Sequence, residues 1–269
     1  MTDLGSYATL RVRFADGVAR ATIDHPPINL LDGDLLRDIA VFGDRVEHDD
    51  DVRVVVFDSA DREFFVAHAD VSMIRALPAE EDATVAALDG FHAVIDRYRT
   101  MPKATIACIE GIARGGGSEF VLALDMRFGA LGRAILSQPE VALGIIPGGG
   151  GTQRLPPLVG RGRALEVILG AEDFPADVAE RYGYLNRALP DGELRPFVDA
   201  LARRIASFPP DAIRLAKAAV SLADGDLPAR LRAEARLFAQ SNATPDARGR
   251  LEGFLAAGGQ TRAVELDGF

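Results

Sequence analysis

The sequence has little of several features that would indicate particular protein classes. Its 269 residues include one cysteine, Cys108, so no disulfide can form within the chain. The apolar neighbours of Cys108 indicate that it is a buried strand residue. No apolar run approaches the roughly 20 residues that span a bilayer. The first residues have neither a basic start nor an apolar stretch. We therefore expect a cytoplasmic protein with no membrane segment.

Positive charge is also scarce. The chain has 30 Lys and Arg against 40 Asp and Glu, a formal net charge of −10. Because nucleic-acid phosphates are usually met by clustered basic side chains, we expect no nucleic-acid partner. A phosphate-bearing substrate would need a local basic patch.

The remaining composition indicates a globular protein with a sizeable core, since 48% of the residues are hydrophobic. Alternating runs at 9–14 and 18–23 around Asp16-Gly17 predict a β-hairpin. Apolar periodicity then predicts the following order of elements: helix 34–46, strand 54–57, helix 82–100 and strand 104–109. Strands alternating with helices indicate an α/β fold with largely parallel pairing, and the hairpin makes the sheet mixed.

The second half of the chain is mostly helical. Helix-like patterns lie near residues 161–169, 175–182, 194–207, 210–222, 227–241 and 245–257. The turn sequence Leu189-Pro190-Asp191-Gly192 divides the chain. We predict an α/β core at 1–192 and a C-terminal helical segment, for oligomerisation or as a lid, at 193–269.

A glycine triplet at residues 115–117 follows the strand 104–109 and precedes Glu119. Phe120 breaks both a dinucleotide G-x-G-x-x-G fingerprint and a G-x-S-x-G elbow, and neither glycine run continues into the Lys of a P-loop. The four histidines form no metal-binding pair at helical spacing, so we predict no metal site.

The remaining interpretation of the triplet is a helix N-terminus whose unpaired N–H groups face developing negative charge. Such a site is half of an oxyanion hole, which enolate chemistry on a thioester requires. A second carboxylate, Glu140, follows in Gln138-Pro139-Glu140, and two carboxylates can divide acid and base roles. A simple tight strand-to-helix turn is the alternative.

With these motifs the chain resembles the enoyl-CoA hydratase/isomerase family, the crotonase superfamily, over most of its length. The matching segments are HPPINLL at 25–31, FVAHAD at 65–70, GGGSE at 115–119 and QPEVALGIIPGGGGTQRL at 138–155. The resemblance implies a crotonase-like spiral of ββα units, assembled as a homotrimer or dimer of trimers. It also implies an acyl-CoA thioester substrate, with coenzyme A as part of that substrate and no other cofactor.

Carried over by residue, the resemblance makes the N–H groups of Ala69 and Gly116 the oxyanion hole. Glu119 would activate water and Glu140 would protonate the α-carbon. The residues it implies for substrate binding are Ile28, Ala67, His68, Asp70 and Pro139. The implied reaction is hydration of a 2-enoyl-CoA. Isomerisation, thioester hydrolysis, decarboxylation and binding without turnover are the alternatives.

The sequence departs from the family in three places. His68 stands where the hydratases usually carry glycine, so it either packs against the loop or acts on the substrate. Pro26-Pro27 lacks a neighbouring basic residue, and the usual basic tail is replaced by residues 256–262 and acidic Glu265 and Asp267. Candidate partners for the coenzyme phosphates are Arg97, Arg99 and Lys103.

Overall fold

A mixed sheet of six strands forms the larger of two sheets in the described part of the chain. The computed structural model describes residues 5–221, 232, 235–236, 238–239 and 242–267. In spatial order the strands are β1 (Leu10–Ala15), β2 (Val18–Ile23), β3 (Val54–Ser59), β5 (Ala104–Ile109), β7 (Met126–Ala130) and β10 (Arg187–Leu189). Only β1 and β2 pair antiparallel, and the other neighbours are parallel, which confirms the predicted mixed sheet.

The predicted hairpin joins β1 to β2. Its two turn residues, Asp16 and Gly17, have φ values of 53° and 75°. Positive φ at both central positions gives a turn whose twist matches that of the strands, and Asp-Gly tolerates it better than most pairs.

A second sheet contains shorter strands. These are β4 (Phe64–Val66), β6 (Ile112–Arg114), β8 (Ile135–Ser137) and β9 (Phe174–Pro175), in that spatial order. The first three run parallel, and β9 pairs antiparallel with β8. Along the chain β3 leads to β4, β5 to β6 and β7 to β8, so each turn of the fold crosses from the large sheet to the small one.

Helices follow these strand pairs. They are α1 (Gly33–His48), α2 (Val71–Arg75), α3 (Glu81–Thr100), α4 (Gly116–Ala123), the 3₁₀-helix η1 (Glu140–Leu143), α5 (Gly151–Val159), α6 (Arg161–Gly170), α7 (Ala176–Tyr182), α8 (Asp191–Ala206), α9 (Pro210–Ser221), α11 (Pro245–Ala256) and α12 (Arg262–Asp267). Helices were predicted at the positions of α1, α3, α6 to α9 and α11. The predicted helix at 227–241 lies mostly outside the described residues.

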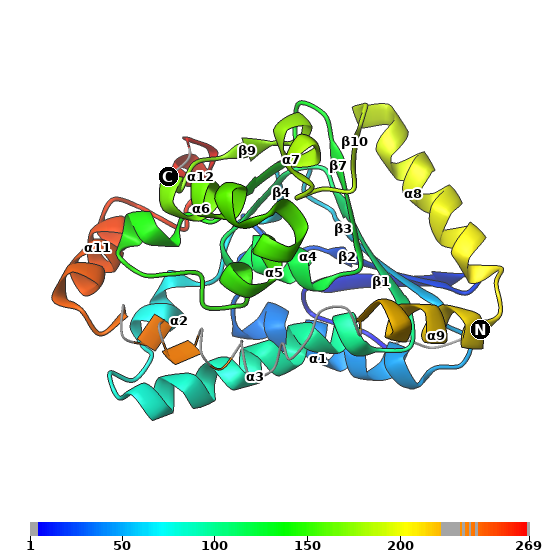
Figure 1. Cartoon of the computed structure of the whole chain (residues 1–269), viewed down its shortest axis with the longest axis horizontal. Helices are drawn as coiled ribbons and strands as arrows, with labels where there is room; N and C mark the ends of the chain where they lie inside the picture. The colour runs from blue at the N-terminus through cyan, green and yellow to red at the C-terminus, as the bar shows by residue number, and fades with distance from the viewer. Residues whose placement is uncertain (1–4, 222–231, 233–234, 237, 240–241, 268–269) are drawn as a thin grey trace.

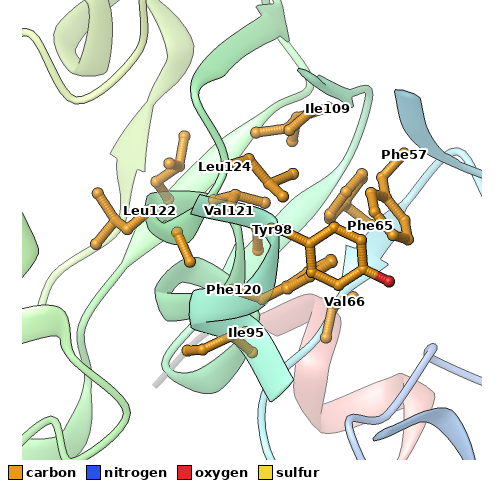
Figure 2. Packing of buried hydrophobic residues seen from close by; sticks show 14 of the residues in the cluster. Phe57, Phe65, Val66, Ile95, Tyr98, Ile109, Phe120, Val121, Leu122 and Leu124 are labelled. Atoms are coloured by element: carbon orange, nitrogen blue, oxygen red, sulfur yellow. The ribbon is translucent and has the colours of Figure 1, made fainter. Parts of the chain in front are cut away.

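Aromatic side chains pack the core between the large sheet and the helices α3 and α4. Phe57 of β3 meets Tyr98 of α3 and Phe120 of α4 edge-to-face, with ring centroids 5.1 and 5.0 Å apart. Figure 2 shows these three rings together with the aliphatic side chains around them. This packing fixes α4, and therefore its N-terminus, relative to the sheet.

The opposite face of the large sheet is covered by α8, which runs along the right-hand side of Figure 1. Cys108 of β5 is buried in this layer, as predicted, and burial raises the pKa of its thiol to about 12. On α8, Arg195 forms ion pairs with the buried carboxylates Asp58 and Glu110. The boundary at residue 192 therefore falls inside a helix that packs on the core sheet, and the division into two units stays a prediction.

The two described C-terminal helices pack on different parts of the core. α11 packs against α2 and η1 through an apolar cluster that includes Val71, Ile145 and Leu251. α12 contacts β6 through Arg114, and Figure 1 shows it near the marked C-terminus. Across the described ranges, none of the helices has the length and apolar character needed to cross a bilayer.

Candidate active site

A cavity of about 340 Å³ lies where the turns after β4 and β6 meet α2, α3 and η1. Most of the residues predicted for the site line it, namely His68, Ala69, Asp70, Gly116, Glu119, Pro139 and Glu140. Its remaining wall is largely apolar, with Leu88, Phe91 and Val94 from α3. The structure thus brings donors, carboxylates and an apolar pocket together.

Ala69 follows β4 and pairs with Leu31 in an isolated parallel bridge. Leu31 N–H donates to His68 O at 2.9 Å, and Asp70 N–H donates to Leu31 O at 3.1 Å. Because N–H and C=O of a trans peptide point in opposite directions, the N–H of Ala69 points away from Leu31. We find no acceptor for it within the part of the chain that the structure describes. It can therefore donate to a ligand in the cavity.

Gly116 begins α4, where N–H groups of the first turn have no partner inside the helix. The preceding Gly115 has φ 47° and ψ −123°, a conformation that side-chain-bearing residues rarely adopt. A Cβ on Gly116 would lie 2.7 Å from Ala69 Cβ and 3.2 Å from Ala69 N. The two predicted donor residues are therefore immediate neighbours, and only glycine permits that approach.

Glu119 lies in the first turn of α4 and is only 4% exposed. Its Oε1 accepts hydrogen bonds from Gly149 N–H at 2.7 Å and Gly151 N–H at 2.9 Å. Burial raises the pKa of this carboxyl, by more than the two backbone donors lower it. The side chain is thus held in place with a pKa shifted toward that of a base working near neutral pH.

The raised pKa of Glu119 predicts a pH-dependent gain in stability for Glu119→Gln. Since the folded state binds this proton more tightly than the unfolded chain, wild-type stability falls as the pH rises above 4.5, the ordinary pKa of the group, and through the raised value. Glutamine does not ionise, so this pH-dependent loss of stability disappears in the variant. Its amide oxygen can still accept hydrogen bonds from the N–H groups of Gly149 and Gly151. We expect its Tm to exceed the wild-type Tm by about 2–4 °C near pH 8.

Thermal unfolding by circular dichroism across acid and neutral pH measures this difference. It should shrink toward zero below pH 4.5, where both states of the wild type are protonated. The exposed Glu180, changed to glutamine, is the matched control. A Glu119→Gln variant no more stable than wild type near neutral pH would contradict the expected result.

Glu140 starts η1, directly after Pro139. Its Oε1 lies 2.8 Å from the position that a Cβ on Gly115 would take. The carboxylate therefore packs against the turn that leads into Gly116, and a side chain at residue 115 would displace it. Glu119 and Glu140 approach the cavity from different elements, one from α4 and one from η1.

His68 is 4% exposed, and both of its ring nitrogens have partners. Nδ1 is 2.8 Å from Ala69 O, and Nε2 is 2.6 Å from Glu265 Oε1. The first of the two sequence-based interpretations, packing against the loop, agrees with these contacts. The imidazole also lines the cavity, so contact with a substrate is compatible with the geometry.

The other predicted substrate-binding residues divide into two groups. Asp70 caps α2 by accepting from Ser72 N–H at 2.7 Å. Burial by itself would raise the pKa of Asp70. Hydrogen bonds from Ser72 and Gln260 lower the pKa by more than burial raises it, so the net shift is downward. In contrast, the side chains of Ile28 and Ala67 lie in a buried apolar cluster and do not line the cavity.

Several residues at the site were not predicted. Gly149 and Gly151 hold Glu119, Phe238 completes the apolar wall, and Glu265 contacts His68. The glycine run at 148–151 was a visible signal, but a role as donor to a carboxylate needs the loop to fold back on α4.

The three candidate phosphate partners lie away from the cavity wall. Arg97 pairs with Asp44 and Glu47, and Lys103 donates to Asp49 O at 2.7 Å. Arg99 pairs with Asp96 on its own helix. Within the described ranges we find no group of three or more His, Cys, Asp or Glu placed to hold a metal ion.

Three strands of the large sheet, β3, β5 and β7, each lead into a strand of the small sheet and then into a helix, and this repeat is the ββα spiral of the crotonase fold, as predicted. The family model described as enoyl-CoA hydratase/isomerase matches residues 13–258. The chain belongs to this family.

Individual relatives agree with this assignment. The short-chain-enoyl-CoA hydratase of Clostridium acetobutylicum is 34% identical over 88% of this chain and 91% of its own length. The crotonyl-CoA hydratase of Syntrophomonas wolfei is 35% identical over 93% of this chain and 96% of its own. A crystal structure from Streptomyces avermitilis, provisionally assigned as an enoyl-CoA hydratase, superposes with a TM-score of 0.88 and 43% identity, covering 97% of this chain and 95% of that one.

Proposed function

We propose that this protein is an enoyl-CoA hydratase, a lyase that adds water reversibly across the double bond of a 2-enoyl-CoA thioester. The observation that carries the proposal is the meeting of Ala69, Gly116, Glu119 and Glu140 on the wall of one apolar cavity. The hydratases of Clostridium acetobutylicum and Syntrophomonas wolfei, which share about a third of their residues with this chain, support the same reaction.

In this proposal the thioester oxygen accepts hydrogen bonds from the N–H groups of Ala69 and Gly116. Negative charge gathers on that oxygen when the β-carbon is attacked, so donors fixed in advance lower the barrier. The start of α4 adds the positive end of a helix dipole at Gly116. The apolar wall of α3 would receive the acyl chain.

The carboxylates divide the proton transfers. Glu119 takes a proton from water as its oxygen bonds to the β-carbon, and Glu140 gives a proton to the α-carbon of the enolate. Glu119 then loses its proton to solvent and Glu140 takes one up, which restores both groups for the next turnover. We propose no cofactor beyond the coenzyme A of the substrate. The inferred cytoplasmic location and the trimer or dimer of trimers stay predictions.

Hydration of crotonyl-CoA and of a longer 2-enoyl-CoA tests the proposal, because the conjugated enoyl thioester loses its absorbance as water adds. We expect turnover at about 1–1000 per second on at least one of them. Coenzyme A binding without turnover on any chain length would contradict it and favour isomerisation, thioester hydrolysis, decarboxylation or binding alone.

A further inference from the structure

One residue of the C-terminal helix contacts the chain just ahead of both donors. The Glu265 carboxylate meets His68 Nε2 at 2.6 Å, and His68 immediately precedes Ala69. The main-chain carbonyl of Glu265 accepts from Arg114 Nη1 at 2.8 Å, and Arg114 lies two residues before Gly116. Residue 265 thus joins the two turns that form the candidate oxyanion hole, although it is about 150 residues or more away from both in sequence.

The surroundings of Glu265 favour a specific polar contact at this point. The side chain is 1% exposed, and a buried carboxylate is costly unless it is paired. Its Oε1 also accepts from Gln260 N–H at 2.8 Å, and its Oε2 lies 4.0 Å from Arg114 Nη1. Arg114 itself forms a two-pronged ion pair with Asp173. The carboxylate therefore has a single well-defined orientation toward His68.

His68 connects Glu265 to Ala69, whose N–H is one of the two candidate oxyanion donors. Its Nδ1 is 2.8 Å from Ala69 O, while its own carbonyl accepts from Leu31 N–H. The imidazole thus has one ring nitrogen at Ala69 O and the other at the Glu265 carboxylate, so the ring spans the two. The peptide groups on both sides of Ala69 are then fixed, and so is the direction of its N–H.

The same segment holds the loop at two further points. Gln260 Nε2 donates to Asp70 Oδ1 at 2.7 Å, and the Phe254 ring packs edge-on against the His68 imidazole with centroids 5.8 Å apart. The Phe254 contact limits the movement of the His68 ring, and the Gln260 contact holds Asp70, the residue after Ala69.

We propose that Glu265 is a positioning residue that sets the direction of the Ala69 N–H through His68. The inference rests on the proposed function, because the aimed donor serves the enolate. It also gives a reason for histidine at residue 68: the imidazole links the loop to the C-terminal helix, a link that glycine could not form.

A double-substitution cycle tests the proposal by measuring kcat and KM for crotonyl-CoA in Glu265→Ala, His68→Ala and the double variant, well below each Tm. Since small misplacement of a donor costs rate more than substrate binding, we expect kcat to fall about 10- to 100-fold in each single variant. KM should stay within about threefold of wild type. The double variant should be no slower than the singles, because both remove one link.

Two further variants separate positioning from a structural role. Glu265→Gln keeps an oxygen acceptor for His68, so it should retain kcat within about threefold of wild type. The matched control, Glu252→Ala, removes an exposed carboxylate of α11 and should leave kcat unchanged. Glu265→Ala keeps the main-chain carbonyl that Arg114 contacts, which favours a docked α12. Unchanged kcat in Glu265→Ala, or losses that multiply in the double variant, would overturn the proposal.

A readout without turnover keeps this inference distinct from the proposed function. Acetoacetyl-CoA can bind as an enolate with charge on its thioester oxygen, and an aimed donor pair stabilises that form. We expect enolate absorbance with the wild type and at least a severalfold smaller signal at saturation with Glu265→Ala. If this difference between the two proteins were seen although the wild type hydrates no enoyl thioester, only the proposed function would be contradicted, and the positioning role of Glu265 would stand. Equal signals in the two proteins, or none in either, would overturn the role of Glu265.

Discussion

Replacing Glu119 by glutamine should lower kcat for crotonyl-CoA hydration by about 10²- to 10⁴-fold, the usual contribution of a positioned general base. Glutamine has nearly the same shape, and its oxygen can still accept from the N–H groups of Gly149 and Gly151. The variant therefore removes proton-accepting ability while leaving the local packing. Stopped-flow or steady-state loss of enoyl absorbance measures the change.

Glu140→Gln should cause a loss of similar size, because the α-carbon then lacks its proton donor. The exposed Glu180→Gln is the control for an uncharged substitution elsewhere. If either site variant kept more than a tenth of the wild-type kcat, that carboxylate would not have the role assigned to it. A full loss in one variant alone would favour an isomerase-like or hydrolase-like use of the remaining group.

Gly116→Ala should reduce kcat by about 10²- to 10³-fold, the cost of removing one oxyanion donor in comparable sites. The added Cβ would lie 2.7 Å from Ala69 Cβ and 3.2 Å from Ala69 N, so the two turns must separate. The φ angle of Gly116 is not in the left-handed region, so the effect comes from the contact rather than from backbone strain.

Gly162→Ala is the matched control for this change, since a Cβ there meets nothing within 4 Å. Alanine in the helix α6 should leave kcat unchanged and keep or slightly raise the Tm. A Gly116→Ala variant with wild-type kcat would show that the donor pair tolerates displacement, and would remove Gly116 from the proposed oxyanion hole.

The elements that the sequence predicted correctly are those with strong local patterns. The Asp16-Gly17 turn, the apolar run of β5 and the long amphipathic helix α3 each carry their signal within a short window. The short strands β4, β6 and β8 were not predicted, because three residues cannot show alternation. In α5 the adjacent prolines Pro156 and Pro157 obscure a helical pattern.

The candidate site shows the same division. The glycine triplet, Glu119 and Glu140 were visible as motifs, and the structure brings them to one cavity. Ile28 and Ala67 belong to matching segments too, but their side chains face a buried cluster. Motif membership places a residue near the site, whereas the direction of its side chain depends on which layer packs over it.

By itself the sequence determined the family, the α/β class and the residue types able to stabilise an enolate, because these depend on local periodicity and on contiguous motifs. Only the tertiary structure decided how Ala69 and Gly116 approach each other and which loop holds Glu119. It also decided that Glu265 faces His68, 197 residues away. Contacts of this kind arise from packing between distant segments, and no short window of sequence contains them.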